Sequence, residues 1–129
     1  MASEHEPRRL LREDGVTVAQ SVDTATSMWQ RFMGLMGRGE LPAGHGLFIH
    51  PCSSIHMFFM RFAIDAAFVD RDLRVVRVYH SLRPWRITRV VRRAKGVFEL
   101  PAGTLAGAGV QTGDTLELVA AQEVSGTPA

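Results

Sequence analysis

The stretch AIDAAFVDRDLRVVRVYHSL, residues 63–82, decides the fold. Its first segment, residues 63–69, is a mostly apolar run of strand length, and the turn sequence DRD at 70–72 separates it from residues 73–82. Every second side chain of an extended segment shares one face. Within residues 73–82, such a face carries Val76, Val78, His80 and Leu82. We therefore predict two consecutive strands joined by a tight turn.

Short runs of the same kind flank this pair on both sides. The further strands that we expect are residues 9–12, 16–19, 46–50, 55–60, 97–100 and 115–119. The run at 55–60 is nearly all apolar, which predicts a strand buried on both faces. About eight short strands separated by turn signals predict a mainly β fold, either a small β-sandwich or a partly open β-barrel.

One short helix is expected near the N-terminus. Thr24 or Thr26 can cap its first turn by accepting backbone N–H bonds. The apolar residues that follow recur at spacings of four, seven and eight, which is typical of one helical stripe. They are Met28, Phe32, Leu35 and Met36. We interpret this stripe as core packing.

The length of 129 residues suits a single domain. We expect a β-rich domain at residues 9–120, with disorder at 1–8 and 121–129. Cys52 is the single cysteine, which excludes an intrachain disulfide. The start has no apolar run long enough for a signal peptide, and no stretch approaches the length of a membrane span. We therefore expect a cytoplasmic protein without a membrane span.

Positive charge is unevenly distributed along the chain. The formal net charge is only +2, and Lys95 is the only lysine among fifteen basic residues. Between Arg74 and Lys95 there are eight basic residues and no acidic one. Such a segment could meet an anion, a nucleic acid or an acidic partner. It could also be a solvated strand edge that blocks unwanted pairing.

Several sequence blocks, in a fixed order, resemble a known family. They are RFMGLMGR at 31–38, LP at 41–42, GLF at 46–48, FMR at 59–61, ID at 64–65, FVD at 68–70, VFELPAG at 97–103 and GD at 113–114. Together they resemble the domain-of-unknown-function family number 192 over roughly residues 16 to 119. The resemblance implies a compact β-rich fold with a short helix near its start, and it implies no agreed activity. Many family members carry an export signal or lipid anchor, which this chain is not expected to have.

Polar side chains around Cys52 form the first candidate site. His50, Cys52 and His56 lie close together in the sequence, beside Pro51 and two serines that favour a bend. An imidazolium beside a cysteine lowers the thiol pKa and can create a nucleophile, and three such ligands can hold zinc. Packing and hydrogen bonding, part of a ligand pocket, thiol catalysis and metal binding all remain open for these residues.

Charged residues within apolar segments form the second candidate site. Arg61 and Asp65 flank an apolar triplet, Glu99 lies within a strand, and Arg31 and Arg38 bracket the end of the expected helix. Buried charges must be paired, so structural ion pairs are one interpretation. Guanidinium groups arranged for a carboxylate or phosphate are another. Two carboxylates in one pocket could instead perform general acid–base catalysis.

Trp85, flanked by Arg83 and Arg86 in a basic connection at residues 83–95, forms the third candidate site. The tryptophan could stack on a base or sugar while the arginines meet phosphate. No nucleic-acid-binding signature accompanies it, so nucleic acid is the less favoured partner. A plug over the mouth of the barrel, or a surface for a protein partner, are the alternatives.

These patterns favour a non-enzymatic domain that binds a small anionic or sugar-like ligand, or a protein partner at the basic rim. We expect the ligand to be held by Arg31, Arg38, His56, Arg61, Asp65 and Trp85. The sequence indicates no catalytic residue, metal or cofactor. The alternatives are a thiol-dependent enzyme or metal site at Cys52 and His56, and nucleic-acid binding through residues 74–95.

Overall fold

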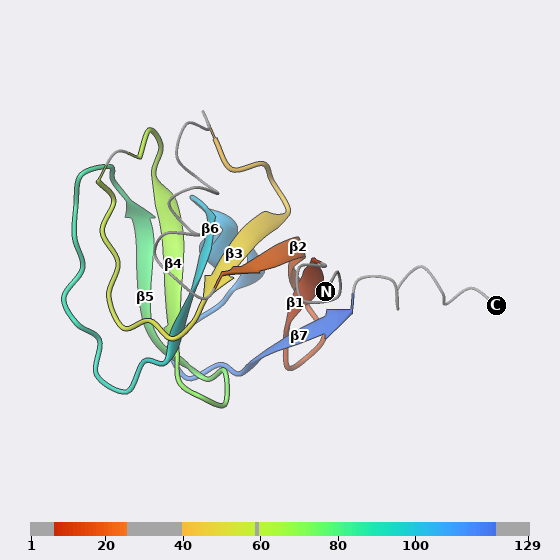
Figure 1. Cartoon of the computed structure of the whole chain (residues 1–129). Helices are drawn as coiled ribbons and strands as arrows, with labels where there is room; N and C mark the ends of the chain where they lie inside the picture. The colour runs from red at the N-terminus through yellow and green to blue at the C-terminus, as the bar shows by residue number, and fades with distance from the viewer. Residues whose placement is uncertain (1–6, 26–39, 59, 121–129) are drawn as a thin grey trace.

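The computed structural model describes residues 7–25, 40–58 and 60–120 of the chain. These residues form a set of strands and one short helix, joined by loops (Figure 1). In chain order the elements are β1 (Arg8–Arg12), β2 (Thr17–Ala25), β3 (His45–Ile49), β4 (Ile64–Val69), β5 (Val75–Leu82), β6 (Gly96–Pro101), α3 (Thr104–Ala108) and β7 (Leu116–Ala120). The mainly β prediction is therefore confirmed.

The strands form one sheet with the order β5-β4-β6-β3-β2-β1-β7. All neighbours in this order are antiparallel except β2 and β3, which run parallel. The central strands β4 and β6 are buried along nearly their whole length. Their alternating side chains must therefore supply apolar surface to both faces of the sheet.

The two edge strands meet near the point where each begins. The Val75 N–H donates to the carbonyl oxygen of Asp114 at 2.8 Å, and the Leu116 N–H donates to that of Leu73 at 2.9 Å. An isolated bridge between Arg74 and Thr115 lies between them. The single sheet thus curls until its edges touch. Of the two architectures expected from the sequence, this is the partly open barrel and not the sandwich.

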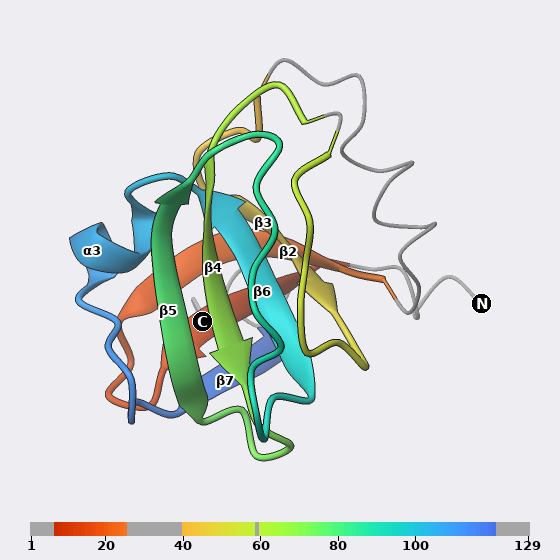
Figure 2. The ribbon, with the colours of Figure 1, turned by 90° about the vertical axis from the view of Figure 1, so that its left-hand side faces the viewer.

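Two apolar clusters stabilise the two faces of the sheet. The inner cluster joins residues from β1, β2, β5, β7 and α3 to one face of β4 and β6, including Phe98, which stacks on Phe48 with ring centroids 4.3 Å apart. The outer cluster packs the opposite face against loop residues such as Ile55, Met57 and Ala94. Figure 2 shows the loops at 50–58 and 83–95 lying over the outer face.

The position of the helix differs from the expectation. Thr24, one of the two expected caps, lies inside β2, and the rest of the expected helix falls at residues 26–36, outside the described residues. The helix that the structure describes is α3, in the C-terminal half of the chain. Within the described residues no helix is long and apolar enough to cross a membrane.

The predicted strand at 55–60 is wrong. In its place a loop makes one isolated bridge, between His56 and Ile87. The loop lies across the outer face of the sheet. Its backbone forms hydrogen bonds with the loop at residues 83–95 and not with a sheet edge. Its apolar character has a different cause from the one expected, since Ile55 and Met57 fill the outer cluster. Seven strands are therefore described instead of about eight.

The expected disorder at the two ends of the chain has a different outcome at each end. Arg8, expected to be disordered, already belongs to β1, and the tail at 121–129 lies outside the described residues.

Candidate ligand-binding rim

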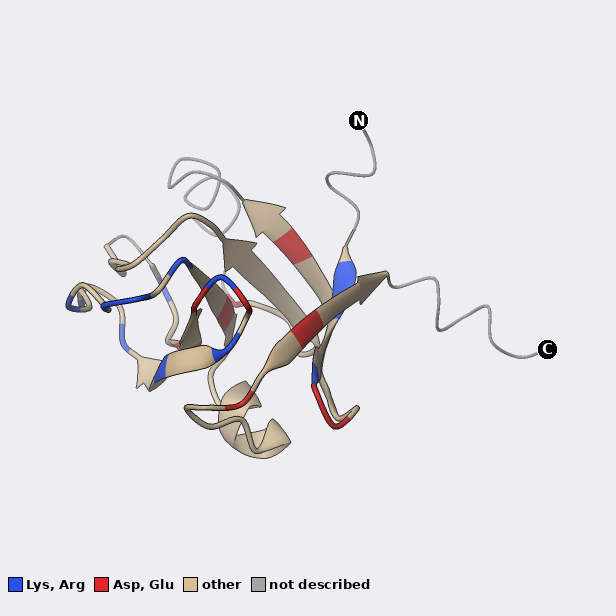
Figure 3. Ribbon diagram, turned by 90° about the horizontal axis from the view of Figure 1, so that it is seen from below, with Lys and Arg blue, Asp and Glu red and all other residues tan. Residues whose placement is uncertain are grey.

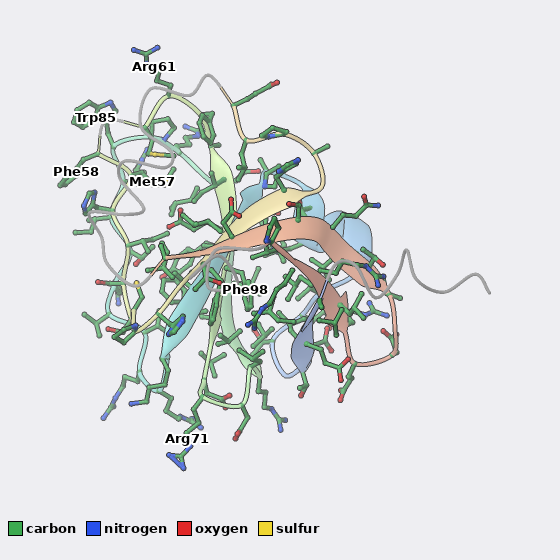
Figure 4. The ribbon with its side chains drawn as sticks, turned by 45° about the vertical axis from the view of Figure 1, so that its right-hand side comes forward. Met57, Phe58, Arg61, Arg71, Trp85 and Phe98 are labelled. Atoms are coloured by element: carbon green, nitrogen blue, oxygen red, sulfur yellow. The ribbon has the colours of Figure 1, made fainter. Side chains whose placement is uncertain are left out.

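The six residues expected to bind a ligand do not all lie together. Arg61 and Trp85 belong to loops at one end of the barrel, the upper left of Figure 4, where Phe58 also lies. His56 stacks on Phe58 and therefore belongs to the same end. Asp65 lies inside β4 and has no solvent exposure. Arg31 and Arg38 lie outside the described residues, so their place in the expected site stays a prediction.

The buried carboxylate of Asp65 is occupied by backbone donors. Its Oδ1 accepts the Ser81 N–H at 2.8 Å, and its Oδ2 accepts the N–H groups of Gly103 and Leu105 at 3.0 and 2.9 Å. These bonds connect β4 to the distorted end of β5 and to the first turn of α3. A carboxylate engaged in three such bonds holds the fold together and has little capacity left for a ligand.

Asp65 and Glu99 face opposite sides of the sheet. Asp65 is paired with Leu100 across β4 and β6, whereas Glu99 is paired with Ala66. Side chains alternate along each strand, so these two carboxylates point away from one another. The hypothesis that they share a pocket for general acid–base catalysis is therefore wrong.

Three aromatic rings form a continuous surface at the end of the barrel. His56 stacks on Phe58 with ring centroids 4.8 Å apart and an interplanar angle of 28°. Phe58 in turn lies 6.0 Å from Trp85, at an angle of 32°. Phe58 is 40% exposed and Trp85 59% exposed, so large apolar area faces solvent here. Exposed aromatic rings clustered in this way are typical of a recognition surface.

Backbone bonds between two loops hold these rings in place. The Trp85 N–H donates to the carbonyl oxygen of Met57 at 2.8 Å, and the Met57 N–H donates to that of Arg86 at 2.7 Å. The side chain of Met57 is fully buried below them. Trp85 has a φ of 69°, in the left-handed region that residues with a Cβ adopt at a cost. Such strain in an exposed aromatic residue is typical of functional surfaces.

Exposed arginines lie close to Trp85 in the sequence or at the same end of the barrel. Arg61, Arg83 and Arg86 are all exposed, and Figure 4 shows Arg61 projecting at the same end as Trp85 and Phe58. Within the described residues the one ion pair joins Arg12 to Asp14, elsewhere on the surface. We call the surface made by His56, Phe58, Arg61, Arg83, Trp85 and Arg86 the aromatic–arginine rim.

The thiol of Cys52 is hydrogen-bonded within its own loop and belongs to no metal site among the described residues. Its thiol donates to the carbonyl oxygen of Ser54 at 3.1 Å. It borders a hollow of about 410 Å³ that is also lined by Ile49, Pro51, Ser53, Ser54, Ala94 and Lys95. No group of three or more His, Cys, Asp or Glu side chains in the described region of the chain could hold a metal ion. A zinc site built from His50, Cys52 and His56 is therefore wrong, whereas a reactive thiol stays a prediction.

Sequence reasoning missed Phe58 as a member of the rim. Phe58 follows Ile55 and Met57 in an apolar run, and nothing in that pattern distinguishes the exposed side chain from the buried ones. The exposure of Ile87 and Val90 was also not expected. In both cases the direction of the side chain depends on how two loops pair over the sheet.

Comparison with known proteins places this fold in a family. The model of the DUF192 family, described as an uncharacterised group, matches residues 9–118. The chain belongs to this family. An uncharacterised UPF0127 protein of Pyrococcus furiosus is 35% identical over 108 residues, covering 80% of this chain and 90% of the relative. A UPF0127 protein of Pyrococcus abyssi is 38% identical over 104 residues, covering 76% and 86%.

Two crystal structures share the fold of this DUF192 protein. One, from Sinorhizobium meliloti, is named as a candidate transcription regulator; it superposes with a TM-score of 0.74 at 29% identity, covering 88% of this chain and 92% of its own. The other, a Novosphingobium aromaticivorans protein of unknown function, has a TM-score of 0.72 at 23% identity, covering 86% and 83%. The second likeness concerns the fold alone.

Proposed function

We propose that this DUF192 protein is a non-enzymatic binding domain that captures an anionic ligand carrying a flat ring at the aromatic–arginine rim. The observation that carries the proposal is the exposure of Trp85 in a strained backbone conformation, beside the stacked pair of Phe58 and His56. A flat base, or the apolar C–H face of a sugar ring, can lie against such rings. The guanidinium groups of Arg61, Arg83 and Arg86 then meet the negative charge.

Asp65 is not part of this site as proposed, because three backbone donors occupy its carboxylate. Arg31 and Arg38 are retained as candidates from the sequence only. His56 contributes as the outer ring of the aromatic stack, and its Nδ1 accepts the Phe58 N–H at 3.3 Å. This bond orients the imidazole against the phenyl ring.

The fluorescence of Trp85 tests the proposal directly. A Trp29→Phe background leaves Trp85 as the single tryptophan, and adenosine monophosphate is titrated against it. We expect quenching that saturates, because the base stacks on the indole. Adenosine and inorganic phosphate each supply half of the ligand and should bind more weakly. Glucose 6-phosphate tests whether a sugar ring serves as well as a base.

Two arginine variants make the test specific. Arg61 and Arg71 are both exposed loop residues, but they lie at opposite ends of the molecule in Figure 4. Arg61→Ala should weaken binding of adenosine monophosphate about tenfold, equal to ~1.4 kcal/mol. Arg71→Ala should leave it unchanged. No quenching by any of the four compounds, in a protein whose circular dichroism is intact, would sink the proposal.

A second candidate function is nucleic-acid binding through the basic segment. It is favoured by the eight basic residues between Arg74 and Lys95 and by the name of the Sinorhizobium meliloti neighbour. Gel shifts at low and moderate salt test it, since affinity for nucleic acid falls steeply as salt rises.

A further inference from the structure

The loop at residues 83–95 contacts the rest of the protein at every third residue. Thr88 and Ala94 are buried, and Val91 between them is partly buried against the outer cluster. The Thr88 N–H donates to the carbonyl oxygen of Ile55 at 2.9 Å, and its Oγ1 accepts the Ile55 N–H at 3.0 Å. The Val91 N–H donates to the carbonyl oxygen of Ser53 at 2.8 Å. The loop is therefore fixed along its length.

Because every third residue of this loop faces the protein, a second series with the same spacing faces solvent, and it consists of arginines. Arg83, Arg86, Arg89 and Arg92 recur at the same interval and are all exposed. We call these four residues the arginine ladder. Three residues of chain span at most ~10 Å, so neighbouring guanidinium groups lie within reach of one continuous polyanion. Ile87 and Val90, which are 67% and 69% exposed, lie between them in the sequence.

The ladder begins within the rim, which shares Arg83 and Arg86 with it. From there it continues through Arg89 and Arg92 along one side of the molecule. In Figure 1 the loop forms the outer left margin from the top of β5 to the start of β6, and Trp85 lies near its upper end. Figure 3 shows Lys and Arg along this loop, whereas Asp and Glu on β2 and β7 lie on the other side. No described residue forms an ion pair with a ladder arginine.

We propose that the ladder and the rim together bind a single-stranded nucleic acid, with phosphates along the arginines and unpaired bases on Trp85 and Phe58. This inference rests on the proposed function of the rim and extends its ligand from one nucleotide to a strand. Aromatic rings joined to a track of positive charge are the usual means of binding single strands. The bases of a duplex are already stacked on one another, and an acidic peptide has no flat ring to offer at each unit.

Binding of oligothymidylates of about 4, 8 and 16 nucleotides tests the inference, because these lengths bracket the site sizes of single-strand binding domains. Fluorescence anisotropy is measured over a series of salt concentrations. We expect affinity to rise with length until the ladder is filled. The slope of log affinity against log salt should approach about −2.8 if all four arginines meet phosphate, at ~0.7 for each contact.

A double variant, Arg89→Ser with Arg92→Ser, should reduce the size of this slope by about 1.4. The matched control is Arg8→Ser with Arg9→Ser, which removes the same charge from β1 on the far side of the molecule. That control should leave the slope unchanged. The ladder variant should still bind adenosine monophosphate as tightly as the parent, because the rim is intact.

The possible failures differ from one another. If adenosine monophosphate binds but the longer oligothymidylates bind no more tightly, the inference is wrong and the proposed function stands. If neither binds, both are wrong. Tighter binding of polyglutamate than of oligothymidylate would overturn the inference in favour of an acidic protein partner. Tighter binding of duplex DNA would overturn it in favour of backbone recognition without stacking.

Discussion

The carboxylate of Asp65 accepts the backbone N–H of Leu105 at 2.9 Å, across forty residues of sequence. This bond ties the start of α3 to the beginning of β4. Leu105 is fully buried in the inner cluster, so the same contact places an apolar side chain at the end of the barrel. Asp65 therefore serves as the anchor of one end of the fold, whereas the rim residues extend from loops at the surface.

Replacing Asp65 by asparagine should destabilise the fold by about 2–4 kcal/mol. The amide nitrogen of asparagine is a donor, so it would face at least one of the N–H groups that the carboxylate now accepts. Urea unfolding followed by circular dichroism measures the effect. Asp72→Asn, at an exposed turn position, should change stability by less than about 0.5 kcal/mol. Equal effects of the two variants would contradict the anchoring role.

Gly96 should not tolerate a side chain. A Cβ there would lie 2.7 Å from the Phe48 ring and 3.1 Å from the carbonyl oxygen of Ile49. Gly96→Ala should therefore cost about 1–3 kcal/mol through overpacking. In α3, a Cβ at Gly107 would meet nothing within 4 Å. Gly107→Ala should instead stabilise the protein by about 0.5–1 kcal/mol, since alanine is the better helix former. Thermal unfolding of both variants distinguishes the two sites.

Alanine variants are usually more stable than glycine variants, and the left-handed backbone of Trp85 should reverse this order. Both substitutions remove the indole, but only alanine retains the strain at φ 69°. Trp85→Gly should be more stable than Trp85→Ala by about 0.5–1 kcal/mol in urea unfolding. At Ile87, which has no left-handed backbone, alanine should be the more stable of the pair. If alanine is preferred at both positions, the backbone at Trp85 is not strained.

Asp14 should titrate at unusually low pH. The guanidinium of Arg12 hydrogen-bonds its carboxylate and lowers the pKa from 3.8 to about 2, with help from the Val16 N–H. A lowered pKa means that the stabilising contribution is present above pH 3.8 and is lost as the pH falls through about 2. Carboxyl carbon NMR measures the midpoint, which Arg12→Ala should move back toward 3.8. An unchanged midpoint in that variant would show that the arginine is not the cause.

Much of the β framework could be predicted because its signals are local. Apolar runs separated by turn residues located β1, β3, β4, β5, β6 and β7 to within a few residues, whereas β2 (Thr17–Ala25) continues well past the expected end at residue 19. The Asp14-Gly15 turn is an example, since Gly15 has a φ of 94° that few other residues adopt. The helix α3 is formed by the mostly small residues TLAGA, whereas the sequence pattern placed the expected helix near the N-terminus.

The candidate site depended on contacts that no local pattern records. Ile55, Met57 and Phe58 have the same apolar chemistry, yet the first two are buried and the third is exposed. Burial here is decided by how the loop lies over the sheet. The polar residues were likewise grouped by sequence as possible partners, but strand pairing directs Asp65 and Glu99 to opposite faces.

The sequence by itself determined a mainly β fold with a basic, tryptophan-containing connection. Residue type and period suffice for that, because strands, turns and net charge are properties of short segments. Only the tertiary structure decided that the sheet curls until β5 meets β7, that Asp65 is enclosed by backbone donors and that Trp85 faces solvent beside Phe58. Those features arise from pairing between segments distant in the chain, whose register and direction are set only when the whole core packs.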